Sequence, residues 1–143
     1  MIVVALVAID MIVQVRIAGA LNPNVTQANI AQTICRPGWT ATVRPSTSYT
    51  DRLKRKQMLA RGLPGPASAY EEDHFIPLEL GGHPTSPLNL WPQPWARTDA
   101  CNAHNKDIDE HAYRRAVCRG LMKLAVAQQR MSDKWKKCKA GNG

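Results

Sequence analysis

The sequence lacks several features that would place it at once in a common class. Its four cysteines include no Cys-x-x-Cys pair, the spacing typical of zinc knuckles and thioredoxin-like redox sites. There is no internal repeat, and no low-complexity tract apart from a lysine-rich segment at residues 134–139. No apolar run is both long enough and free enough of charge to cross a bilayer as a helix. A zinc knuckle, a thioredoxin-like redox protein and a membrane-spanning protein are therefore disfavoured.

Acidic residues are few relative to basic ones. The chain of 143 residues has 11 Asp and Glu against 19 Lys and Arg, a formal net charge of +8. This balance favours a polyanionic partner, either nucleic acid or an anionic membrane face. Hydrophobic residues make up 44% of the chain and charged residues 21%, which is ordinary for a folded protein, and the length fits one domain.

The first twenty residues resemble a secretory signal. Residues 1–8 are apolar, and Ala18-Gly19-Ala20 fits the small-x-small cleavage pattern, although Asp10 and Arg16 interrupt the segment and no basic start precedes it. We therefore expect a signal peptide over residues 1–20 and one domain over 21–143, in a bacterial protein that is periplasmic or secreted. The alternative is that residues 1–20 form the first strand or helix of the domain.

The even number of cysteines predicts two disulfides in an exported protein. Cys35, Cys101, Cys118 and Cys138 allow three connectivities, of which we prefer Cys35–Cys118 with Cys101–Cys138. In a reducing compartment the same residues would be four buried thiols.

Hydrophobic periodicity, caps and turn residues predict a mixture of helices and short strands. Helices are expected at 26–34, from a cap at Ser48 to Arg61, at 99–118 and at 121–131, and strands at 39–43, 71–78 and 88–91. The order strand, strand, helix across 71–118 is a ββα unit with helices before and after it. The expected fold class is α+β.

The dipeptide Asp73-His74 carries the chemistry of this unit. A carboxylate oxygen suits Mg²⁺ or Mn²⁺, and an imidazole can take a proton from water near neutral pH. Neighbouring side chains on a strand point in opposite directions, so both reach one cleft only near a bend or bulge. Taken alone, the pair is a surface dipeptide.

Its surroundings change that interpretation. Asp73-His74, then Pro77, Gly81-Gly82 and Asn89-Leu90 follow in an order that closely resembles the motif of HNH endonucleases, members of the His-Me finger superfamily. The flanking strings around Cys35, Val43 and Val117 are similar to those of small exported bacterial HNH-like proteins. The resemblance implies a small ββα-metal core with flanking helices.

The resemblance also implies roles for single residues. Asp73 matches the first metal ligand, His74 the general base, and Asn89 the residue that braces the histidine loop through hydrogen bonds to backbone. A second ligand is expected on the following helix, where Asn102 is our choice and His104 the alternative. The chain departs from many family members in lacking a histidine at that place and a Cys-x-x-Cys knuckle.

Together these features predict a Mg²⁺-dependent endonuclease of low sequence specificity that acts on nucleic acid, with DNA the expected substrate. Lys106, Arg114 and Arg115 are candidates for phosphate contacts, although a solvated helix face explains them equally well. The four tryptophans could stack on bases but are expected in the core. The rival hypothesis is a disulfide-stapled module with an HNH-like fold that binds nucleic acid or another polyanion without cleaving it.

Overall fold

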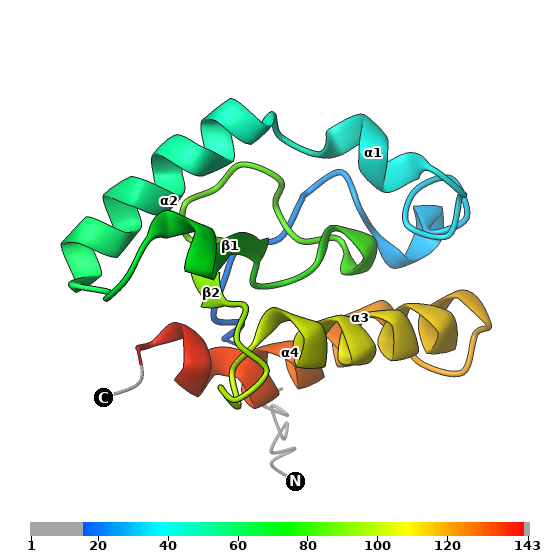
Figure 1. Cartoon of the computed structure of the whole chain (residues 1–143). Helices are drawn as coiled ribbons and strands as arrows, with labels where there is room; N and C mark the ends of the chain where they lie inside the picture. Colours follow the sequence, from blue (N-terminus) through cyan, green and yellow to red (C-terminus); the bar gives the residue numbers. More distant parts are fainter. Residues whose placement is uncertain (1–15, 142–143) are drawn as a thin grey trace, which may run out of the picture.

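The structure is a computed structural model that describes residues 16–141. In Figure 1 a two-stranded sheet lies in the middle, with α1 and α2 on one side and α3 and α4 on the other. The elements, in chain order, are η1 (Gln27–Asn29), α1 (Trp39–Val43), α2 (Thr47–Arg61), η2 (Ala67–Ala69), β1 (Tyr70–His74), η3 (Leu78–Leu80), β2 (Leu90–Pro94), α3 (Ala103–Cys118) and α4 (Leu124–Lys139). The expected α+β class is confirmed, and β1, β2 and α3 follow one another as predicted.

The sheet consists of β1 and β2 in antiparallel register, with Glu72 opposite Pro92 and His74 opposite Leu90. Both predicted strands exist, but the second begins later than the predicted 88–91 and extends past its expected end to include Pro92 and Pro94. Each strand of a two-stranded sheet is an edge, so a proline is tolerated where its missing N–H would point outward. Strand β1 ends at His74, four residues before the predicted end.

The prediction of a strand at 39–43 is wrong, because these residues form helix α1. The β-branched residues in this segment suggested period 2, yet Trp39 is buried and Val43, one turn later, packs against the same core. The Thr42 hydroxyl donates to Trp39 O at 2.6 Å, so it satisfies a backbone acceptor within the helix. Helical spacing therefore buries both apolar side chains.

The three long helices occur where predicted, with shifted ends. Helix α2 is capped by Ser46, whose side chain accepts from Tyr49 N, rather than by Ser48, and it ends at Gly62 in the left-handed conformation as expected. Helix α3 starts at Ala103 behind the cap residue Asn102. Helix α4 continues through the lysine-rich segment because Met131 and Trp135, four residues apart, are both buried.

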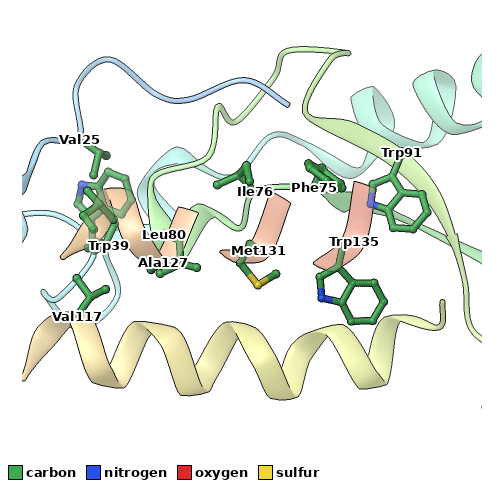
Figure 2. Close-up of a cluster of buried hydrophobic side chains, with 12 residues drawn as sticks. Val25, Trp39, Phe75, Ile76, Leu80, Trp91, Val117, Ala127, Met131 and Trp135 are labelled. Carbon is green, nitrogen blue, oxygen red and sulfur yellow. The ribbon is translucent and has the colours of Figure 1, made fainter. Parts of the chain in front are cut away.

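The core lies between the sheet with its connecting loop and helices α3 and α4 (Figure 2). Phe75 and Ile76, directly after β1, are completely buried, and Met131 and Trp135 of α4 pack in the same cluster. The residue that follows Asp73-His74 is thus a core residue, which fixes the end of β1.

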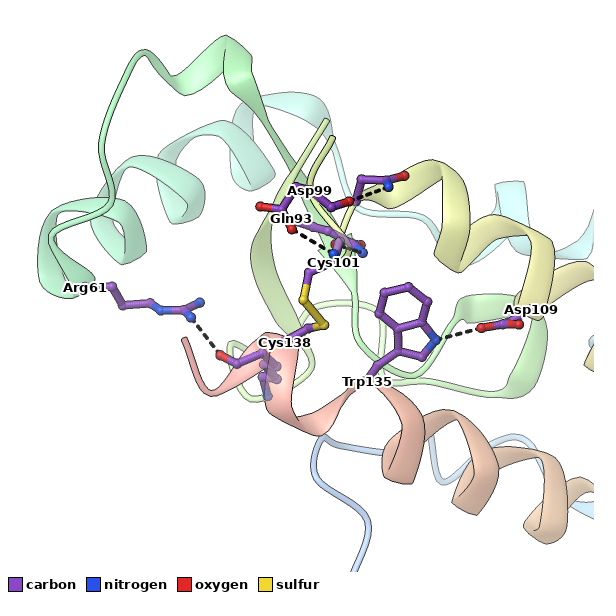
Figure 3. Close-up of a disulfide and its surroundings, with 9 residues drawn as sticks. Arg61, Gln93, Asp99, Cys101, Asp109, Trp135 and Cys138 are labelled. Atoms are coloured by element: carbon purple, nitrogen blue, oxygen red, sulfur yellow. Dashed lines mark hydrogen bonds between the residues drawn. A yellow bond between two sulfur atoms is a disulfide. The ribbon is translucent and has the colours of Figure 1, made fainter. Parts of the chain in front are cut away.

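Two disulfides join distant segments, with the predicted connectivity. Cys35–Cys118 links the segment before α1 to the end of α3, and Cys101–Cys138 links the segment before α3 to the end of α4. Figure 3 shows the second bridge with the bond from the Arg61 guanidinium to Lys139 O, 2.7 Å, which joins α2 to the same helix end. Such disulfides indicate a non-reducing compartment.

The predicted signal peptide lies mostly outside the described residues. The part that is described packs on the domain: Ala18 N donates to Ser132 Oγ at 2.8 Å, and Ala20 O accepts from His83 N at 2.8 Å. The domain boundary at residue 20 stays a prediction. Within residues 16–141, no helix combines the length and apolar character needed to span a membrane.

The disulfides yield a test of stability. Cys35 and Cys118 are 83 residues apart and Cys101 and Cys138 are 37 apart, so the first bridge restricts the unfolded chain more. Replacing either pair by serine should lower the free energy of unfolding by about 4 kcal/mol, with the Cys35/Cys118 loss about 0.7 kcal/mol larger. Urea unfolding of both double variants measures the difference, and the reverse order would contradict the loop-entropy account.

Candidate active site

Two cavities lie on either side of β1, and His74 lines both. Alternation along the strand sends Tyr70 and Glu72 to a cavity of about 270 Å³ and Asp73 to a cavity of about 210 Å³. We call the first the open-strand cavity and the second the acidic cavity. The open-strand cavity is further lined by Arg44, Pro45, Thr47, Thr50, Asp51, Lys54, Glu71 and Trp95. The acidic cavity is further lined by Arg44, Glu71, Glu79, Asp107, Glu110 and His111.

His74 is held in one orientation and one tautomer. Its Nε2 lies 2.8 Å from Pro84 O, and because a carbonyl only accepts, Nε2 carries the proton. In the neutral ring Nδ1 is then the proton acceptor. Nδ1 has no hydrogen-bond partner among residues 16–141 and is not sealed from solvent. Burial lowers the pKa of His74, and the hydrogen bond to Pro84 only partly opposes this, so the ring stays neutral near pH 7.

The loop that carries Pro84 is built around Asn89. Its Oδ1 accepts from Ile76 N at 2.9 Å, and its Nδ2 donates to Ile76 O at 2.9 Å and to His83 O at 3.0 Å. Asn89 is completely buried, so all three bonds are made away from water. The side-chain bonds to backbone that the resemblance implied for this residue are therefore present, and they place the Pro84 carbonyl opposite His74.

Two further residues shape this loop. A Cβ at Gly82 would lie 1.7 Å from Ile76 O, so only glycine allows the loop to approach the end of β1 this closely. His83 accepts through Nδ1 from Thr85 N at 3.2 Å and Ser86 N at 3.0 Å, which closes the turn after Pro84.

The Lys106 ammonium is completely buried between β1 and α3. It donates to Asp73 Oδ2 at 2.7 Å, to His74 O at 2.7 Å and to a Glu110 carboxylate oxygen. All three N–H bonds have acceptors inside the protein, so Lys106 is not available for the predicted phosphate contact. Burial alone would lower the pKa of Lys106, but Asp73 and Glu110 outweigh it and the net shift is upward.

Carboxylates crowd the acidic cavity. Burial raises the pKa of Glu71 to about 7, with further contributions from the charges of Asp73 and Asp107. Burial likewise raises the pKa of Glu110 to about 8, against the attraction of Lys106. On the other side of the strand, both oxygens of Glu72 are buried without a hydrogen-bond partner among the described residues, and burial raises the pKa of Glu72 to about 8. The sequence alone does not single out these acids, because their burial depends on the packing of α3 and α2.

The two candidates for the second metal ligand lie elsewhere. Asn102 caps α3, with Oδ1 accepting from Asn105 N at 2.9 Å and Nδ2 donating to Asp99 O at 2.6 Å, and it does not line the acidic cavity. The His104 ring packs on Trp95 with centroids 5.3 Å apart. The structure therefore brings Asp73, His74 and Asn89 together but not Asn102 or His104. Both lie at the start of α3, and the side chains of this helix that reach β1 come from its next turns.

A divalent ion can be fitted only in a mostly hydrated form. Within residues 16–141, no three His, Cys, Asp or Glu side chains converge to hold a metal. Asp73 nevertheless keeps Oδ1 without a hydrogen bond to any described residue and open to solvent, and Glu71 and Asp107 line or adjoin the same cavity. Mg²⁺ commonly binds through one or two carboxylates and several waters, so this oxygen-rich donor set suits it in kind.

The remaining predicted phosphate contacts are outside both cavities. The Arg114 guanidinium donates to Ile34 O at 2.9 Å and so holds the segment near Cys35, while Arg115 is exposed on α3. The cation that does line both cavities is Arg44, which sequence reasoning left unassigned because the segment before it was taken for a strand.

The buried ammonium gives the second prediction. Lys106→Met removes a completely buried cation from two half-buried carboxylates, so the free energy of unfolding should fall by about 3–5 kcal/mol. Lys136→Met, which removes an ammonium from an exposed ion pair with Asp133, should leave unfolding nearly unchanged. Adding Asp73→Asn and Glu110→Gln to Lys106→Met should restore much of the loss. Urea unfolding that finds no restoration would mean that lost packing, and not unpaired charge, explains the effect.

Comparison with known proteins adds no relative to this geometry: no family model matches the chain, and neither a curated protein nor a solved structure does. The assignment of the site therefore depends on its residues and their arrangement.

Proposed function

We propose that the protein is a nucleic-acid phosphodiesterase of the HNH type, an endonuclease with DNA as the expected substrate. The observation that carries this proposal is His74. Its Nε2–H is fixed on Pro84 O, its Nδ1 has no hydrogen-bond partner among the described residues while the residue lines both cavities, and the free carboxylate oxygen of Asp73 belongs to the adjacent residue. Few structural roles require a buried imidazole to be neutral, oriented and open at one nitrogen, whereas a general base requires all three.

In this mechanism His74 Nδ1 takes a proton from the water that attacks phosphorus. As the new P–O bond forms, the bond to the leaving sugar oxygen breaks, and that oxygen takes a proton from solvent. Asn89 keeps the imidazole in place through the loop it braces. Lys106 keeps Asp73 beside the base and is not itself a substrate contact.

Asp73 Oδ1, with Glu71 or Asp107, would hold a hydrated Mg²⁺ or Mn²⁺ ion. Such an ion supplies positive charge against the charge that develops on the phosphate oxygens. These proposed metal ligands differ from the predicted ones, among which Asn102 or His104 was the second ligand.

Net charge and disulfides agree with a nuclease that works outside the cytosol. The chain carries a formal charge of +8, so affinity for nucleic acid would come largely from backbone phosphates and would fall with salt. Export to the bacterial periplasm or medium would supply the oxidising conditions in which both bridges form. No recognition module beyond the single domain is evident in residues 16–141, which favours low sequence specificity.

Two observations favour the rival, a binding module without turnover. Asp73 is already paired with an internal cation, and the described residues contain no convergent set of three ligands. Such a module would bind nucleic acid through the same cavities and leave it intact.

Plasmid cleavage with Mg²⁺ separates the two. His74→Ala should lower the cleavage rate by roughly 10²–10⁴-fold, because a positioned base is lost. Added imidazole should restore part of the rate in His74→Ala and none in a variant that has merely unfolded, which a thermal melt checks. Undiminished cleavage by His74→Ala would sink the assignment of the base, and absence of cleavage by both proteins with nucleic-acid binding retained would favour the binding module.

A further inference from the structure

Arg44 is a free cation at the junction of the two cavities. It lines the open-strand cavity and the acidic cavity, and the two share only Arg44, Glu71 and His74. The side chain is exposed and forms no hydrogen bond or ion pair with a described residue. The Lys106 ammonium, by contrast, donates all three of its N–H groups to acceptors inside the protein. Arg44 is thus the guanidinium that a phosphate beside His74 would meet.

Trp95 is the tryptophan that is not a core residue. Trp39, Trp91 and Trp135 are at most 8% exposed, whereas Trp95 is 38% exposed and lines the open-strand cavity. The His104 ring packs against it at 5.3 Å with the ring planes inclined by 48°. Its backbone N–H is bound to Ala69 O at 3.0 Å, so the residue is anchored on the end of the sheet. An exposed indole supported in this way is suited to stacking on a planar ligand.

The wall between these two residues is polar. Thr47 and Thr50, in the first turn of α2, contribute hydroxyl groups to the open-strand cavity. Lys54 adds an ammonium that is held by Tyr70 O at 2.9 Å and lies 3.9 Å from Asp51. Three acids, Asp51, Glu71 and Glu72, also line this cavity of about 270 Å³; burial raises the pKa of Glu71 to about 7 and that of Glu72 to about 8, and Asp51 lies near Lys54. The cations and the one aromatic face match the two chemical halves of a nucleotide.

We propose that the open-strand cavity binds one nucleotide of a single-stranded or locally unpaired chain, with its phosphate on Arg44 and its base stacked on Trp95. This inference rests on the proposed function for its substrate class. A base can lie on an indole only when its own face is not covered by neighbouring bases, so the arrangement discriminates against an intact duplex. The same phosphate, held by Arg44, would lie beside His74.

The test measures binding apart from cleavage. Fluorescence anisotropy of a labelled single-stranded oligonucleotide and of the matching hairpin duplex is recorded with wild-type protein in EDTA, and again with His74→Ala. Trp95→Ala should weaken single-strand binding about 10-fold and duplex binding little, since one stacked base is lost. Trp95→Phe should retain most of the single-strand affinity.

Arg44→Ala should weaken both substrates and reduce the slope of log affinity against log salt by about one phosphate contact. Arg55→Ala removes an exposed guanidinium on α2 that lies outside both cavities, and it is the matched control. It should change binding far less than Arg44→Ala.

The outcomes separate this inference from the proposed function. Equal loss of single-strand and duplex binding in Trp95→Ala, or no loss in either, overturns the nucleotide site even if the wild type cleaves DNA through His74. A Trp95-dependent preference for single strands in a wild type that never cleaves supports the nucleotide site and overturns the phosphodiesterase. Equal effects of Arg44→Ala and Arg55→Ala overturn the phosphate contact.

Discussion

The buried ammonium of Lys106 is the interaction on which the arrangement of this domain depends. A cation without exposure to water is tolerated only when every N–H finds an acceptor, and the three acceptors come from the side chain of Asp73, the backbone of His74 and the side chain of Glu110. Those groups belong to β1 and α3, so the requirement sets how the strand and the helix meet. It also directs Asp73 into the acidic cavity with one oxygen bound and one free.

The position of His74 follows from a second constraint, the burial of the residues around it. Phe75 and Ile76 enter the core immediately after the strand, so β1 ends at His74. The imidazole of His74 therefore borders both cavities. Asn89 then holds the returning loop against Ile76, and the loop supplies the Pro84 carbonyl that fixes the tautomer. Orientation, neutrality and access at His74 thus come from packing and backbone hydrogen bonds, and Lys106 keeps Asp73 alongside.

Sequence reasoning located much of this site and missed its electrostatics. Asp73, His74 and Asn89 could be identified because they occur in one short motif, and the disulfide connectivity we preferred is the one observed. Lys106, the partner of Asp73 on α3, could not be identified, because hydrophobic periodicity predicts a helix but does not show which of its turns faces the strand. Lys106 was accordingly taken for a phosphate contact. Arg44 was not predicted as a site residue, because the β-branched residues before it led us to predict a strand where helix α1 lies.

The central claim is that the protein holds His74 as a neutral base with its proton on Nε2. Nitrogen-15 NMR of histidine-labelled protein, with the His74 signals assigned by comparison with His74→Ala, tests it directly near pH 7. The account predicts a protonated Nε2 and an unprotonated Nδ1, with no averaging between tautomers. A protonated Nδ1, a doubly protonated ring or an exchanging mixture of tautomers would contradict it.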